Sequence, residues 1–340
     1  MEKSTSRKRI DWISLLRGLT IVLVVMNHVR MLELSTGANY AFVHEIRALF
    51  QPLRIPTFIF VSGALLYLTR INKGWRTPEL YVDKTIRIGF PLIFCTFLGC
   101  IMQIMFNGFV KHPKDVGIDT FFYSLIDYDT TPWPHRWYLI TLLFMMALYP
   151  LYLLVIRMGK RAVTFLGIIL LALYFCDFKQ FTTTNWCQLF TLNKYLLFFY
   201  LGIVSFKYSL WKYLDNAVAL LVCLIMYWGT YFAVPHNNYT LILMSLSGIM
   251  LMISLCLFLS HPFPKLFSSF RSYIFQIYLF GIAFQAFVEL ILWRALGCPD
   301  SLAYLFYVLN ILAGVYLPVL MSKVVEKIPY RPIRLCFGLN

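Results

Sequence analysis

The chain has 340 residues, of which 60% are hydrophobic and only 13% are charged, and its formal net charge is +15. Soluble domains carry about 25% charged residues, so this composition excludes a protein whose whole surface faces water. The positive charge does not indicate nucleic acid as a partner, because the cytoplasmic loops of membrane proteins are enriched in Lys and Arg. The sequence therefore predicts an all-α polytopic membrane protein that contacts membrane lipid.

The N-terminal segment is basic and precedes an apolar run, as in a signal peptide, but no A-x-A-like cleavage site follows it. We therefore interpret the run as an uncleaved first span. The eight cysteines are scattered, without a C-x-x-C pair or a spacing typical of metal ligands. We expect neither a disulfide framework nor a metal site.

About ten apolar runs reach or approach the roughly 20 residues that cross a bilayer core as a helix. No separate soluble domain is visible, so we interpret 1–340 as a single integral-membrane domain. The predicted transmembrane helices cover 11–31, 48–69, 87–109, 136–156, 162–177, 193–209, 216–234, 240–260, 273–293 and 302–322.

The charges of the connecting loops predict the topology. Loops on the N-terminal side of the membrane hold 20 of the 30 Lys and Arg residues, against eight in or beside the opposite loops. The positive-inside rule then places both termini in the cytoplasm, with 1–10 as the N-terminal segment and 323–340 as the tail. The largest extracytoplasmic loop, 110–135, is interpreted as a solvated loop, a lid or part of an acceptor site.

The first span contains two ionisable residues, Arg17 and His28. Such residues usually face the protein interior, because a charge inside a span costs about 3 kcal/mol on insertion scales. Eleven residues make just over three helical turns, so an ideal helix places both on one face with a rise of roughly 16 Å. In the alternative interpretation, Arg17 extends to the inner interface and His28 lies at the outer one, without a chemical role.

A second group of basic residues follows the second span on the cytoplasmic side. Lys84 and Arg87 are three residues apart at the start of an expected helix, so they share a face. Such a face suits phosphates, although positive-inside topology explains the charges equally well. The whole group is Arg70, Lys73, Arg76, Lys84 and Arg87.

The fourth span opens with "HRWYLITLL" at 135–143, which places aromatic and basic side chains at the outer interface. Trp137 and Tyr138 in this segment are also typical of residues that anchor a span in the interface. The residues alone leave both interpretations open.

Together these segments resemble the membrane-bound acyltransferase-3 family. "IDWISLLRGLTIVLVVMNH" is similar to the opening signature of the family, which has an aspartate, an L-R-G motif and an R-x10-H pair. Asp11, Leu16-Arg17-Gly18 and His28 stand at the family's spacing. Further similar segments follow in the same order along the first 205 residues. They are "PTFIFVSGALLY" at 56–67, which contains Ser62, "KTIRIGFP" at 84–91, "HRWYLI" at 135–140 and "FFYLGI" at 198–203.

The chain departs from the family pattern at two positions. Lys84 replaces the first arginine of an R-x-x-R stretch, which keeps the charge but loses the bidentate fork of a guanidinium. In "RSYIFQIYLFGIAFQ", Gly281 stands where a histidine is common in the family. No extracellular hydrolase-like domain follows, so we expect the membrane-only form.

The resemblance implies an acyl-CoA-dependent acyltransferase of the cell membrane, with a bacterial inner membrane as the expected location. It would move an acyl group, by default acetyl, from cytoplasmic acyl-CoA to a hydroxyl of a cell-surface polysaccharide or its lipid-linked precursor. Acyl-CoA is then a substrate, and no permanently bound cofactor is expected. The roles implied are catalytic for His28 and Arg17, acyl-CoA-binding for Lys84, Arg87 and Arg76, and supporting for Asp11, Ser62, Trp137 and Tyr138.

His28 is expected to act as the general base, because neutral imidazole is the usual base near pH 7. A covalent acyl-histidine is the alternative mechanism. Arg17 would hold a phosphate or support the geometry of the site. Two other functions remain open: a transporter or flippase of a glycan or lipid intermediate, which would also use intramembrane charge, and a membrane scaffold without chemistry.

Overall fold

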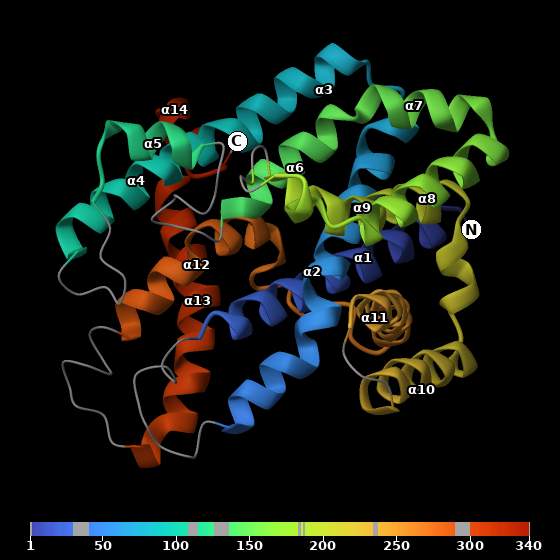
Figure 1. Cartoon of the computed structure of the whole chain (residues 1–340). Coiled ribbons are helices and arrows are strands. Elements are labelled where there is room, and N and C mark those ends of the chain that lie inside the picture. Colours follow the sequence, from blue (N-terminus) through green and yellow to red (C-terminus); the bar gives the residue numbers. More distant parts are fainter. Residues whose placement is uncertain are drawn as a thin grey trace. The chain divides into compact units, whose positions relative to one another are not determined.

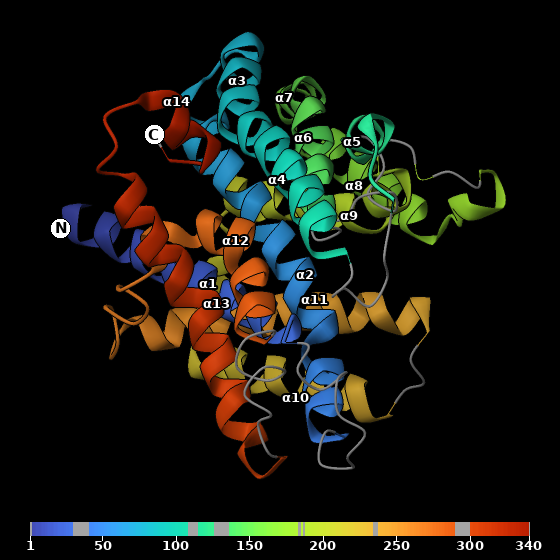
Figure 2. The ribbon, with the colours of Figure 1, turned by 90° about the vertical axis from the view of Figure 1, so that its left-hand side faces the viewer.

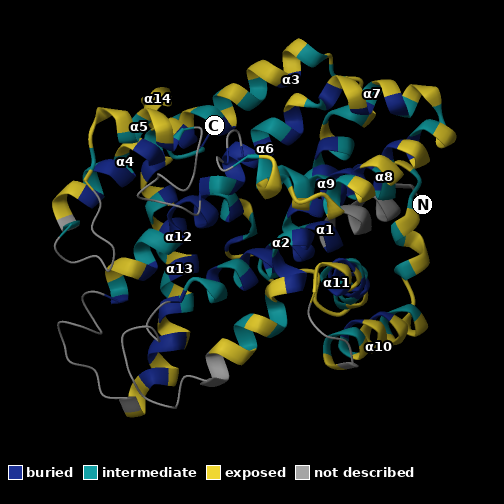
Figure 3. Ribbon diagram, viewed as in Figure 1, coloured by how far each residue is buried: buried dark blue, intermediate teal, exposed yellow. Residues whose placement is uncertain are grey.

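The computed structural model describes residues 2–29, 41–107, 115–125, 136–182, 185, 188–233, 237–289 and 300–339 (Figure 1). Every regular element in these ranges is helical, which confirms the predicted all-α class. Many positions of the long helices are exposed (Figure 3), and large apolar side chains occur among them. On α4 (Phe90–Phe106), for example, Ile93, Phe97 and Ile104 are all more than half exposed. Their near-helical spacing forms an apolar stripe on the outer face, as expected where a helix contacts lipid.

The helices form two compact units, and the first comprises residues 1–64 and 205–324. In this unit α11 packs against both α1 and α10, and α1 also packs against α12. Figures 1 and 2 show α10 and α11 side by side. The long helices of the unit are α1 (Glu2–Asn27), most of α2 (Ala41–Thr69), α10 (Ala217–Ala233), α11 (Asn238–Ser260), α12 (Ile274–Val288) and α13 (Ala303–Val325).

The second unit comprises residues 65–204 and 325–340. A π-helical segment, Thr85–Gly89, connects α3 to α4, while α4 packs against α5 and α14, and α7 packs against α8. In addition to α4, its helices are α3 (Thr77–Lys84), α5 (Ile118–Ser124), α6 (Trp137–Ala147), α7 (Tyr149–Met158), α8 (Lys160–Phe175), α9 (Leu189–Lys207) and α14 (Arg331–Cys336).

Five helical stretches in the described residues are long and apolar enough to cross a membrane: His44–Lys73, Thr77–Met105, Leu189–Lys207, Asn238–Ser260 and Ala303–Val325. The pair α6 and α7 makes a sixth if it counts as one bent span. Two shorter apolar helices cover Trp12–Asn27 and Ala217–Phe232. The described helices thus support a polytopic chain, while ten spans with both termini in the cytoplasm stay a prediction.

One expected span, 136–156, is broken in the structure. The axes of α6 and α7 differ by 44°, and the break lies at Leu148. Pro150 follows in the first turn of α7, where its missing N–H leaves no helical hydrogen bond unmade. A proline inside a helix removes one backbone bond and clashes with the preceding turn. The helices α2 and α13 continue through prolines, whereas here the chain begins a new helix just before Pro150.

The loop 110–135 is described only in part. Residues 115–125 contain α5, which packs against α4, whereas 108–114 and 126–135 lie outside the described residues. The interpretations of this loop as a lid or acceptor site therefore remain predictions.

Candidate active site

Arg17 and His28 both belong to the α1 segment, but the regular helix ends at Asn27. The His28 N–H donates to the carbonyl of Val25 at 3.0 Å, three residues back, so the last turn is tighter than an α-turn. Both side chains are half-buried. The positions of an ideal α-helix therefore apply only up to Asn27. The direction in which the His28 side chain leaves the backbone depends on the tighter closing turn.

A glutamine from α12 contacts the same closing turn. Gln285 Nε2 donates to the Val25 carbonyl at 3.1 Å, so this oxygen accepts from both Gln285 and the His28 backbone. Asn310 of α13 in turn donates through Nδ2 to the Gln285 carbonyl at 3.4 Å. Gln285 and Asn310 are fully buried. The turn that carries His28 is thus attached to α12 and, through it, to α13.

Two glycines allow these helices to approach closely. A Cβ atom at Gly281 would lie 2.7 Å from the carbonyl oxygen of Gly314, and one at Gly314 would lie 2.8 Å from side-chain atoms of Gln285 and Val25. Atoms at such separations overlap, so a side chain at Gly281 would push against the α13 backbone, and one at Gly314 would displace the side chains of Gln285 and Val25. A side chain as large as histidine would therefore have no room at position 281 in this packing.

The glycine after Arg17 also has a packing role. A Cβ atom at Gly18 would lie within 2.8–3.0 Å of three side-chain atoms of Phe267. Phe267 itself has a positive φ of 62°, a conformation that is uncommon for a bulky residue. The absence of a side chain at Gly18 thus lets the Phe267 ring pack directly against α1.

The remaining predicted residues of the first unit are Ser62 and Asp11. The Ser62 hydroxyl donates to the carbonyl of Phe58 at 3.0 Å, a bond within its own helix. Asp11 lies on α1, but its side chain lies outside the described part of the chain.

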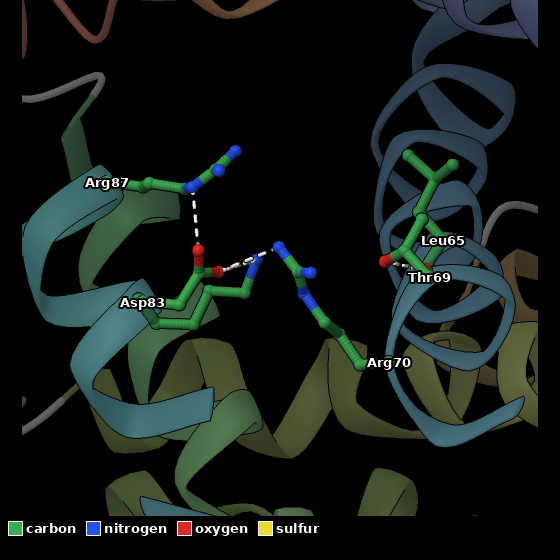
Figure 4. Close-up of polar contacts among 6 residues, drawn as sticks. Leu65, Thr69, Arg70, Asp83 and Arg87 are labelled. Atoms are coloured by element: carbon green, nitrogen blue, oxygen red, sulfur yellow. Dashed lines mark hydrogen bonds and ion pairs between the residues drawn. The ribbon is translucent and has the colours of Figure 1, made fainter. Parts of the chain in front are cut away.

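In the second unit, one carboxylate gathers three cations (Figure 4). Asp83 Oδ1 lies 2.7 Å from Nε of Arg87, and its Oδ2 lies 2.9 Å from Nη2 of Arg70 and 3.5 Å from Nζ of Lys84. The Asp83 side chain is only 12% exposed, whereas that of Arg87 is 47% exposed. We call these four residues the Asp83 cluster. It brings the predicted Lys84 and Arg87 together and adds a third cation and an anion.

Arg70 follows the last residue of α2, and a tight turn returns the chain over it. Gly74, in the left-handed conformation with φ +70°, closes this turn, and the Trp75 N–H donates to the Arg70 carbonyl at 3.1 Å. The Trp75 ring centroid then lies 3.7 Å from Cζ of Arg70, a cation–π contact. Tyr149 of α7 donates its hydroxyl to the Trp75 carbonyl at 2.8 Å. The Arg70 guanidinium is therefore held between the Trp75 ring and the Asp83 carboxylate, and Tyr149 supports the Trp75 backbone.

The third predicted donor-binding residue, Arg76, is exposed and lies at the N-cap of α3. Its backbone N–H donates to Oε2 of Glu79 at 3.1 Å. Among the described contacts, none joins Arg76 to the Asp83 cluster. Sequence reasoning did not identify Asp83, although the i,i+4 spacing from Asp83 to Arg87 is the spacing of a helical ion pair.

Trp137 and Tyr138 lie at the start of α6. The Trp137 ring stacks on that of Tyr195 from α9, with centroids 5.7 Å apart, and Tyr138 is buried edge-on to Trp137. The preceding Arg136 is also buried, and its Nη1 donates to the Thr96 hydroxyl of α4. Sequence reasoning placed Arg136 only at the end of a span. The sequence does contain a signal for its burial: a cation at the edge of an apolar run usually faces the protein interior rather than lipid.

The candidate residues thus form two groups. Arg17, His28 and Gln285 belong to the first unit, and the Asp83 cluster with Trp137 and Tyr138 belongs to the second. The first group offers an imidazole on a fixed turn, and the second offers cations that suit phosphate.

Comparison with known proteins identifies the family. The family model described as an acyltransferase domain, that of the acyltransferase-3 proteins, matches residues 10–323. Searches among curated proteins and among solved structures gave no significant match. The matched range covers nearly the whole chain, including His28 and the Asp83 cluster. The chain therefore belongs to the acyltransferase-3 family of membrane acyltransferases.

Proposed function

We propose that this protein transfers an acyl group, by default acetyl, from acyl-CoA to a hydroxyl of a cell-surface polysaccharide or its lipid-linked precursor. The observation that carries the proposal is His28, an imidazole on the closing turn of α1 that Gln285 fixes to α12. A base that removes a proton from a hydroxyl must be held within hydrogen-bond reach of it. The bonds to the Val25 carbonyl supply such a restraint.

In the proposed reaction, His28 accepts the proton of the acceptor hydroxyl while the hydroxyl oxygen attacks the thioester carbon of the donor. The imidazolium then returns the proton to the departing CoA thiolate, so atoms and charges balance. The imidazolium forms at the carbonyl end of α1, where the helix dipole stabilises positive charge by about 0.3–1 kcal/mol. An acyl-histidine intermediate is the alternative course, and a trapped acyl-imidazole adduct would favour it.

The cations of the second unit support a phosphate-bearing donor. Lys84 and Arg87 lie beside Asp83 together with Arg70, and the three cations outweigh the one carboxylate. Charge-assisted bonds from guanidinium groups to phosphate are among the stronger polar contacts in proteins. Arg17, about 16 Å from His28 along an ideal helix, would hold a phosphate or support the site rather than stabilise the oxyanion.

The proposed location is a bacterial inner membrane, with about ten spans and both termini in the cytoplasm. This orientation would place the Asp83 cluster on the side of cytoplasmic acyl-CoA and His28 towards an outward-facing acceptor. The excess of Lys and Arg in the loops on the N-terminal side supports it.

The test compares His28→Ala with His261→Ala by mass spectrometry of the surface glycans. We expect His28→Ala to lower acylation by about 10²–10⁴-fold, the usual contribution of a general base. His261, which is exposed and lies 4.0 Å from Asp215, serves as the control and should leave acylation unchanged. The His28 N–H bond to Val25 belongs to the backbone, so alanine retains it. Full acylation in the His28→Ala strain would refute the proposed base, and glycan missing from the surface but normally acylated would indicate transport.

A further inference from the structure

The Asp83 cluster contains a carboxylate in addition to the cations of the basic segment. Arg70, Lys84 and Arg87 carry three positive charges around the single negative charge of Asp83, which leaves a net charge of +2. The side chains of Arg70, Asp83 and Lys84 are each less than one-fifth exposed. Like charges this close and this poorly hydrated repel one another, so the carboxylate is what allows the three cations to share one place.

The carboxylate also orients the guanidinium groups. It contacts Arg87 through Nε and Arg70 through Nη2, and Figure 4 shows the Nη atoms of Arg87 pointing away from Asp83. A guanidinium held at Nε keeps its outer N–H groups in a fixed plane, which suits bidentate contact with phosphate oxygens. Because Arg87 is 47% exposed, these groups lie where a ligand can reach them.

Arg70 enters the cluster from outside the helix that carries the other three residues. It lies directly after α2, and the stacked Trp75 ring and the bond from Tyr149 to the Trp75 carbonyl support its position. Two guanidinium groups from different segments thus reach opposite oxygens of one carboxylate. The arrangement is built by the fold of the second unit and is not a consequence of loop charge alone.

We propose that Asp83 is a positioning residue of the donor site, which gathers Arg70, Lys84 and Arg87 into one place that receives a phosphate group of acyl-CoA. This inference rests on the proposed function, since it takes acyl-CoA as the donor. The net charge of +2 matches one phosphate dianion, or the two charges of a diphosphate. Asp83 itself does not contact the ligand; it fixes the cations that do.

The experiment compares Asp83→Asn with Glu79→Gln in the purified full-length protein. Both variants replace a carboxylate of α3 by its amide, but Glu79 is exposed, and in the part of the chain that the structure describes its carboxylate accepts from the Arg76 N–H and contacts none of the three cations. Binding of CoA is measured by isothermal titration calorimetry, and the donor KM and kcat are measured with acetyl-CoA. We expect Asp83→Asn to weaken CoA binding by about tenfold or more, as for loss of one charged contact. The kcat at saturating donor and the Glu79→Gln protein should stay close to wild type.

The source of the phosphate is distinguished by repeating the titration with 3′-dephospho-CoA. If Asp83→Asn weakens binding of CoA but not of 3′-dephospho-CoA, the cluster receives the 3′-phosphate. If it weakens binding of both, the cluster receives the diphosphate. Asp83→Glu, which keeps an anion for all three cations and displaces it by one methylene, should give an intermediate donor KM. This variant tests the proposal even if Asp83→Asn does not fold.

Three results would overturn the inference. If Asp83→Asn binds CoA as tightly as the wild type and Asp83→Glu has the wild-type donor KM, the ion pairs of Asp83 serve only the structure and do not prepare a phosphate site. Tighter binding in Asp83→Asn would mean that the carboxylate competes with phosphate instead of preparing its site. Failure of the wild-type protein to bind CoA would refute the donor itself, and with it both proposals, whereas the first two results leave the proposed function intact.

Discussion

Replacing Gln285 with leucine tests whether this residue positions His28 for the proposed reaction, separately from its contribution to stability. The change removes the Nε2 bond to the Val25 carbonyl, the contact that attaches the His28 turn to α12. It also removes Oε1, which is buried and has no hydrogen-bond partner among the described residues. Leucine has a similar size, so the packing between α12 and α13 is largely kept.

The expected effect on stability is small. An interhelical hydrogen bond inside a membrane protein contributes about 0.6 kcal/mol on average. Removing a buried acceptor without a partner relieves a penalty of about 1–3 kcal/mol, which offsets the lost bond. The Val25 carbonyl still accepts the His28 N–H at 3.0 Å, so no buried backbone group is left unpaired. We therefore expect the unfolding transition of Gln285→Leu to stay close to that of the wild type.

The expected effect on activity is larger. Displacing a catalytic group by 1 Å can lower a rate by about 10²-fold, which corresponds to about 2.7 kcal/mol in the activation free energy. With the turn released from α12, we expect kcat to fall about 10- to 100-fold while the donor KM stays unchanged. The assay follows transfer from labelled acetyl-CoA to the lipid-linked glycan fraction, beside thermal unfolding of the same preparation.

Gln276→Leu provides the matched control. It removes another buried glutamine from α12, about 13 Å away along the helix. Its kcat should stay near that of the wild type. A wild-type kcat in Gln285→Leu, or a loss of activity fully accounted for by unfolding, would refute the positioning of His28 by Gln285.

Two further predictions follow from close contacts in each unit. Gly281→Ala should lower the free energy of unfolding by about 1–3 kcal/mol, the usual cost of overpacking, because the new Cβ would overlap the Gly314 carbonyl. Gly229→Ala, where the space is open, is the control, and equal melting temperatures of the two variants would contradict the prediction. Tyr149→Phe removes the hydroxyl bond to Trp75 and should cost about 1 kcal/mol of stability. It should also weaken CoA binding slightly through Arg70, and titration with CoA checks this, with identical affinity counting against the supporting role of Trp75.

The sequence predicts the long helices well because each apolar run carries its own signal. The expected spans 240–260 and 302–322 agree closely with α11 (Asn238–Ser260) and α13 (Ala303–Val325). The helical face that joins Lys84 to Arg87 follows from local spacing in the same way. Features that depend on neighbours within a few residues were therefore accessible from the sequence.

Other features depend on residues far apart in the chain. Gln285 and Val25 are separated by 260 positions, and no local pattern in one sequence relates them. The bend between α6 and α7 does have a local signal in Pro150. The span was predicted from the mean hydropathy of the run, however, and one residue hardly changes that mean. Asp83 was missed because an acid in a basic segment is typical of a solvated surface charge, and only the structure places Arg70 beside it.

The glycine at 281 and the contact of Gln285 are connected through α13. Because Gly281 has no side chain, the Gly314 carbonyl oxygen can lie only 2.7 Å from the position that a Cβ would take, and α13 stays close to α12. That closeness lets Asn310 donate to the Gln285 carbonyl and brings Gly314 against the Gln285 side chain, which in turn bonds to Val25. A histidine at 281 would separate the helices that restrain the His28 turn. Glycine at 281 therefore belongs to the same packing that holds the His28 turn, and the two positions should be considered together when the proposed general base is tested.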